Sequence, residues 1–248
     1  MVKYELRKLF AHQLFFPAVV AVLVIWIFMM SHTPSDAILM KSLTFWNILG
    51  SFAMGLIILL IATRIFSQDR EDQVEDVFNT TKRGKRQLFI ARLQASSLFT
   101  IVTVLLFIGI QLGGVLFFKT SEQAVNIPYD VSVTAYFILQ TFSVLLGANF
   151  FTLFACVICS TVKSHPITLI SCGLLYGISY ITRTSLVNKY TIHWLLDKGF
   201  FSYLIRGKLF HNSPIDFVEL GLLAAWYGIL LAIVMIINKN LQRRRKEI

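Results

Sequence analysis

The sequence predicts an all-α membrane protein with six transmembrane helices, which form a single transmembrane domain over residues 1–248. Its composition is the first reason: 56% of the residues are hydrophobic and 15% are charged, whereas about a quarter of the residues in a soluble domain are charged. The second reason is that the apolar residues fall in blocks, and about 20 apolar residues span the ~30 Å hydrocarbon core of a bilayer. The blocks predict spans at approximately 14–31, 43–66, 90–118, 132–159, 166–182 and 218–238.

Lysine and arginine residues in the connections predict the orientation of these spans, because cytoplasmic loops carry an excess of both. With the N-terminus in the cytoplasm, the inner segments hold 15 of these bases and the outer segments hold seven. Both termini are therefore expected to be cytoplasmic, including a basic tail at 239–248. The net charge of +10 fits this topology together with attraction to anionic lipid headgroups, so it does not indicate nucleic-acid binding.

The interiors of the spans lack acids and bases, and the chain lacks enzyme motifs. Proton- or ion-coupled transporters usually place titratable groups inside the membrane. Their absence disfavours such a transporter, although a Na⁺ site built from carbonyl and hydroxyl oxygens stays open. No GxxxxGK[ST], HExxH or GxSxG motif occurs, so no catalytic, cofactor or metal site is predicted. Cys156 and Cys159 form a CxxC inside an apolar run, where they are interpreted as small apolar side chains.

An amphipathic helix is expected at 1–13, before the first span. Its apolar residues are Val2, Leu6, Leu9 and Phe10. Their spacing puts them on one side of a helix, and helices at a membrane surface bury such a side at the headgroup boundary. These four residues are therefore predicted to form the membrane face of the helix.

The connection at 67–89 sorts its charges by sign, with five acids within residues 69–76 and five bases within residues 82–92. Asp69 is suited to cap a helix, and acids in a first turn and bases in a last turn both favour a helix. Val74, Val77 and Phe78 would share one face of it. The segment therefore predicts a short amphipathic helix. Its apolar face either packs on the inner ends of the neighbouring spans or enters a groove on a cytoplasmic partner.

This order of parts resembles the type 2 ABC exporter permease family over nearly the whole chain. Three stretches carry the resemblance: KYELRKLFAHQL is similar to the family's elbow helix, DREDQVEDVFNTTKRGKRQLFIAR to its coupling helix, and residues 183–217 to its short outer helices between spans 5 and 6. By residue, the similarity is strong only across about 66–92. The family often has Gly where Gln73 stands and Pro near Lys82.

The resemblance implies a transport subunit that is not itself an enzyme. Such permeases pair with a second membrane subunit, here expected to be an identical copy, and with two copies of a cytoplasmic ATPase that binds ATP and Mg. The implied ATPase contacts are Asp69, Arg70, Glu71, Val74, Val77 and Phe78, with a secondary contact at Lys163. The resemblance also implies a location in the bacterial cytoplasmic membrane.

The outer segment at 183–217 interleaves aromatic rings with basic residues. Aromatic rings can sit at headgroup depth while bases face the phosphates, so one interpretation is an interfacial helical hairpin that caps the bundle. The other interpretation is an outer gate formed by Trp194, Phe200, Phe201 and Tyr203.

The expected function is a path for a hydrophobic or amphipathic substrate, such as a peptide, an antibiotic, a drug or a lipid-linked molecule, powered by the separate ATPase. Spans without charges favour such a substrate. Two alternatives stay open. One is a non-transporting membrane sensor or scaffold that recruits a cytoplasmic partner through the segment at 67–89, and the other is a cation-coupled secondary transporter.

Overall fold

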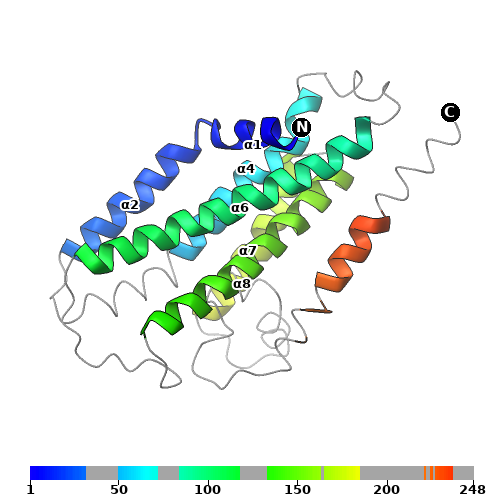
Figure 1. The fold of residues 1–248 in the computed structure, drawn as a ribbon. Helices are drawn as coiled ribbons and strands as arrows, with labels where there is room; N and C mark the ends of the chain where they lie inside the picture. The colour runs from blue at the N-terminus through cyan, green and yellow to red at the C-terminus, as the bar shows by residue number, and fades with distance from the viewer. Residues whose placement is uncertain are drawn as a thin grey trace, which may run out of the picture.

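The computed structural model describes residues 1–31, 50–71, 84–117, 133–162, 165–184, 221, 224–225 and 227–236. These residues form seven helices and no strand, which confirms the all-α prediction. In chain order the helices are α1 Val2–Phe10, α2 Phe15–Ser31, α4 Ser51–Glu71, α6 Gly84–Phe117, α7 Val133–Val162, α8 His165–Thr184 and a C-terminal helix Tyr227–Ile236 (Figure 1).

Each predicted span overlaps one of these helices, but several helices extend beyond the predicted limits. α4 continues past its apolar stretch to Glu71, and α6 begins at Gly84 instead of residue 90. Glutamine, glutamate, lysine and arginine are good helix formers, so both helices can continue into the polar segment where the apolar residues end.

Membrane-spanning length is a stricter criterion than overlap. Among the described residues, one helical stretch, Gln87–Gly113, is long and apolar enough to cross a membrane. Val2–Phe10 and Phe15–Met29, which are bent by 50°, supply a second if they count as one span. Phe52–Phe66, Val144–Ser160 and Tyr227–Ile236 are shorter apolar helices. Six spans therefore stay a prediction.

The bundle is organised around α6, which has 34 residues. It packs against α1, α4 and α7, and α4 also packs against α7 and α8 (Figure 1). Between the helices lie large side chains that are less than 2% exposed: Ile58, Ile61, Phe99, Phe107, Phe151 and Tyr176. Because such interiors are close-packed, the shapes of these side chains determine how the helices meet.

Neutral polar side chains also join α6 to α7. The Ser97 hydroxyl donates to Asn149 Oδ1 at 2.7 Å, and the hydroxyl oxygens of Thr100 and Thr152 lie 2.6 Å apart. Each of the two threonines also lies within bonding distance of the carbonyl four residues before it. These contacts give the four side chains hydrogen-bond partners inside an otherwise apolar interface.

The outer surface of the bundle is apolar along much of its length. Large apolar side chains that are at least half exposed occur on α2, α6, α7, α8 and the C-terminal helix: Phe16, Val20, Val24, Ile25, Phe28, Leu105, Ile138, Phe142, Ile167, Ile170, Leu174, Ile229, Leu231, Met235 and Ile236. Soluble monomers rarely expose large contiguous apolar patches, which are typical of surfaces that contact a membrane or another protein.

Candidate functional site: the charged end of the bundle

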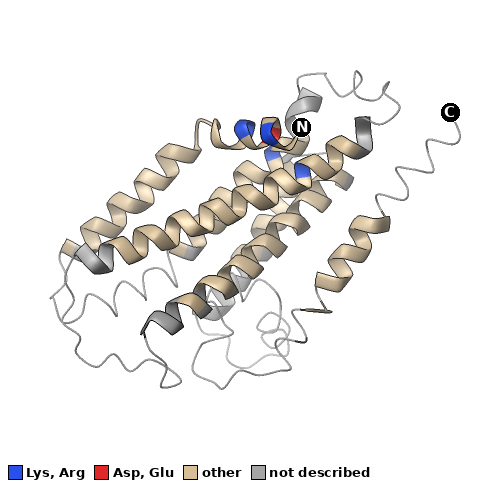
Figure 2. Ribbon diagram, viewed as in Figure 1, with Lys and Arg blue, Asp and Glu red and all other residues tan. Residues whose placement is uncertain are grey.

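The charged residues that Figure 2 colours lie at one end of the bundle. Among the side chains that the structure describes, the charged ones are Lys3, Glu5, Arg7, Lys8, Arg64 and Arg92. They belong to α1, to the second half of α4 and to the first third of α6. α4 ends and α6 begins at this end of the bundle, so residues 72–83 connect the two helices here.

The helix α1 lies across this end and packs against α6 and α4. Leu9 is 3% exposed, and Val2, Leu6 and Phe10 are partly buried against the core. The Phe10 ring contacts Phe15 at 5.4 Å and Phe99 at 5.1 Å between ring centroids. The face that was expected to lie against the membrane therefore packs on the protein's own helices. The amphipathic helix itself is present where the sequence places it.

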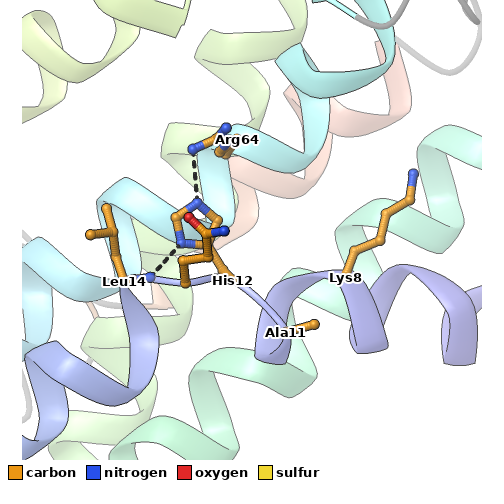
Figure 3. A pocket seen from close by; sticks show the side chains of 6 residues that line it. Lys8, Ala11, His12, Leu14 and Arg64 are labelled. Carbon is orange, nitrogen blue, oxygen red and sulfur yellow. Dashed lines mark hydrogen bonds between the residues drawn. The ribbon is translucent and has the colours of Figure 1, made fainter.

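A hollow of about 540 Å³ lies where the turn between α1 and α2 meets α4 (Figure 3). It is lined by Lys8, Ala11, His12, Gln13, Leu14 and Arg64, none of which is acidic. In the turn, the Leu14 backbone N–H donates to His12 Nδ1 at 3.2 Å. On the other side of the same ring, Arg64 Nη1 lies 2.9 Å from His12 Nε2. The hollow thus joins residues that are 52 positions apart in the chain.

The two contacts of His12 both require its ring to accept a hydrogen bond. A backbone N–H and a guanidinium can only donate, and a neutral imidazole offers a single acceptor nitrogen. If Nδ1 accepts the Leu14 N–H, then Nε2 carries a proton and faces the Arg64 donor. If Nε2 accepts from Arg64 instead, Nδ1 carries the proton, so the tautomer decides which of the two contacts is a hydrogen bond.

The adjoining ends of α4 and α6 are held together by a second cation. Arg92 of α6 is 9% exposed, and its guanidinium lies 5.7 Å from the centre of the Phe66 ring of α4. That ring also meets Phe89 of α6 edge-on, with 6.1 Å between the ring centroids. A cation over an aromatic face is attracted by the electron-rich ring. The pair fastens the two helices close to the segment that joins them.

The structure corrects one detail of the connection at 67–89. Asp69 does not begin a new helix, because Asp69, Arg70 and Glu71 form the last residues of α4. Their amides take part in the helix that starts at Ser51, so no N-cap is needed at Asp69. The next described helix, α6, begins at Gly84.

The other predicted contact residues lie outside the described part of the chain. These are Val74, Val77 and Phe78 of the connection, Lys163, and the proposed gate residues Trp194, Phe200, Phe201 and Tyr203. The tail at 239–248 also lies outside it. Their roles stay predictions.

The cysteines of the CxxC are buried and are not joined in a disulfide. The Cys156 and Cys159 thiols point to the backbone carbonyls of Ala62 and Thr63 in α4, at 3.9 and 3.4 Å. Within the described residues, no group of three or more His, Cys, Asp or Glu side chains is placed to hold a metal ion. These two cysteines therefore contribute to the packing of α7 on α4.

No model of a known protein family matches the chain, and no curated protein matches it. The functional proposal below therefore depends on the geometry of the bundle and of its charged end.

Proposed function

We propose that this chain is the membrane permease subunit of an ATP-driven exporter, of the kind found in the type 2 ABC exporter family. Together with a second membrane subunit it would form the path for a hydrophobic or amphipathic substrate. A separate cytoplasmic ATPase would supply the energy by binding and hydrolysing ATP with Mg.

The observation that carries this proposal is the separation of charged and apolar surfaces on the bundle. Among the described residues, the charged ones lie at one end (Figure 2), while large exposed apolar side chains follow the length of the outer helices. Each charged side chain at the centre of a membrane helix costs about 2.5–3.5 kcal/mol. Exposed apolar side chains, in contrast, are favourable in hydrocarbon. This distribution favours a bundle in a bilayer whose charged end reaches the aqueous phase.

The construction of the charged end supports the energy-coupling part of the proposal. The segment 72–83 connects α4 to α6. The contact of Arg92 with Phe66 joins these two helices, and α1 packs against both of them. A displacement of that segment by the ATPase would move α4 and α6 directly. α4 and α6 both contact α7, so the movement would spread through the bundle.

The experiment tests whether the apolar face of that segment engages an ATPase. The Val74→Asp/Phe78→Ala variant should lose co-purification with the cytoplasmic ATPase and lose substrate-dependent ATP hydrolysis, because a charge and a cavity replace the apolar contact. Gln73→Ala, in the same segment but outside the apolar face, serves as the matched control and should retain both. Size-exclusion chromatography monitors the assembly of the unmodified protein, the double variant and the Gln73→Ala control.

The same measurement distinguishes the scaffold alternative. A scaffold would bind its cytoplasmic partner through the segment, yet substrate would not stimulate hydrolysis in the unmodified complex. Unchanged binding and hydrolysis in the Val74→Asp/Phe78→Ala variant would overturn the assignment of this face as the ATPase contact.

A further inference from the structure

We infer that the outer face of α1, formed by Lys3, Tyr4, Arg7 and Ala11, lies against the membrane surface and prefers anionic lipid headgroups there. This inference rests on the membrane location in the proposed function, but it does not depend on the ATPase partner. It assigns membrane contact to the face of α1 opposite the apolar face that packs on α4 and α6.

The two faces of α1 differ in charge. Glu5, the acid of this helix, is 3% exposed, whereas Lys3 and Arg7 are exposed. Lys3, Arg7 and Ala11 follow one another at intervals of four residues, so they form one row along the helix surface. Neither of the two bases forms an ion pair with any residue that the structure describes. The outer face of α1 therefore offers positive charge to a partner outside the bundle.

Exposed aromatic and apolar side chains accompany these bases. Tyr4 is 64% exposed and Met1 is 61% exposed, and Lys8 Nζ lies 5.0 Å from the centre of the Tyr4 ring. In helices that lie in the interface of a membrane, aromatic rings sit at headgroup depth while basic side chains face the phosphates. Bases alone would fit an acidic protein surface equally well, so Tyr4 and Met1 favour the membrane over such a partner.

The position of α1 at the start of α2 brings this face to the headgroup layer. The two helices are bent by 50°, so α1 does not continue along α2 but crosses the charged end of the bundle. The exposed apolar surface of α2 begins at Leu14 and Phe16, which are 54% and 65% exposed. Arg7 precedes Leu14 by about two helical turns, or roughly 10 Å, and the headgroup layer adds about 5–8 Å to each side of the hydrocarbon core. With lipid chains on Leu14 and Phe16, the headgroups therefore reach the outer face of α1.

The test measures which lipids surround α1 in the full-length protein, reconstituted in phosphatidylcholine vesicles. A bimane fluorophore on an Ala11→Cys variant reports from the outer face, and the three native cysteines are buried. The quencher is a nitroxide near the top of an acyl chain, carried by either phosphatidylglycerol or phosphatidylcholine at equal mole fraction. Phosphatidylglycerol should quench at least about twofold more strongly, because basic residues near the surface attract anionic headgroups. This preference should fall as the salt concentration rises.

Two double variants in the labelled background show which charges set the preference. Lys3→Gln/Arg7→Gln should lose at least about half of it, since both bases lie on the outer face. The matched control is Arg244→Gln/Arg245→Gln, which removes the same charge from the tail at 239–248 and should keep the preference. Equal loss in both double variants would show only diffuse attraction to a basic protein and would overturn the proposal.

The unmodified protein supplies the remaining outcomes. Equal quenching by the two lipids would overturn the preference for anionic headgroups. Quenching by neither lipid would place this face away from the membrane, as an acidic protein partner would require, and it too would overturn the proposal. Loss of ATPase co-purification would refute only the proposed function, whereas failure of the protein to insert into vesicles would refute both.

Discussion

Gly55 of α4 lies directly against the side chain of Tyr176 of α8. A Cβ atom added at position 55 would lie 2.9 Å from Cε1 of that ring and still nearer to its hydroxyl end. The ring is 0% exposed and stacks with Phe52 and with Phe151, at centroid distances of 5.7 and 5.3 Å, so it cannot move without disturbing these neighbours. Only a residue without a side chain permits this approach of α4 to α8.

Gly55→Ala is therefore expected to lower the free energy of unfolding by about 1–3 kcal/mol, the usual cost of overpacking a filled core. The measurement is thermal unfolding of the full chain in detergent. Gly109→Ala is the control, because a Cβ at Gly109 meets nothing within 4 Å. Replacing that helical glycine should leave the protein unchanged or stabilise it by up to about 1 kcal/mol. Equal behaviour of the two variants would contradict the close packing of α4 on α8.

The hydroxyl pair of Thr100 and Thr152 gives a prediction about the interface of α6 and α7. Thr100→Val removes the contact between helices, while Thr103→Val removes a hydroxyl that donates to the Phe99 carbonyl of its own helix. The first variant should be less stable than the second by about 0.5–1 kcal/mol, the range found for hydrogen bonds between membrane helices. Chemical denaturation of both variants under one set of conditions measures the difference, and a smaller loss in Thr100→Val than in Thr103→Val would refute the role of the pair.

Leu9 tests whether α1 is part of the bundle. Its side chain is 3% exposed against the core, so Leu9→Ala should cost about 2–5 kcal/mol by leaving a cavity. Tyr4, on the same helix and 64% exposed, supplies the control: Tyr4→Ala should stay within about 0.5 kcal/mol. Thermal unfolding of both variants is the measurement. A helix that rested only on lipid would respond to neither change in this assay.

These relationships also show what the sequence could and could not predict. The helices lie where apolar blocks occur, because the block pattern is local and reports which residues avoid water. The local sequence does not show which neighbour each apolar face packs against. Val2, Leu6, Leu9 and Phe10 have the spacing of a membrane face, but a lipid chain and a protein core are both apolar and produce the same spacing. The pattern therefore identified the helix but not the packing of this face on the protein's own helices.

The charged end was predictable in part. Sign-sorted charges at 69–92 indicated a polar end of the bundle, and the structure places the ends of α4 and α6 there. The meeting of His12 with Arg64 was not predictable, since it depends on the 50° bend between α1 and α2 and on the packing of α1 against α4. The sequence shows only that Arg64 ends an apolar block and that His12 lies between two helical segments. Neither feature indicates that the two side chains meet.

The central claim is that the segment after α4 faces the cytoplasm and is covered there by an ATPase. The most direct measurement is labelling of a Phe78→Cys variant with a membrane-impermeant maleimide, in vesicles of known orientation with and without the ATPase. The three native cysteines are buried, so they should contribute little background. We predict labelling from the cytoplasmic side only, and protection when the ATPase is bound. Labelling from the opposite side, or equal labelling with and without the ATPase, would contradict the account.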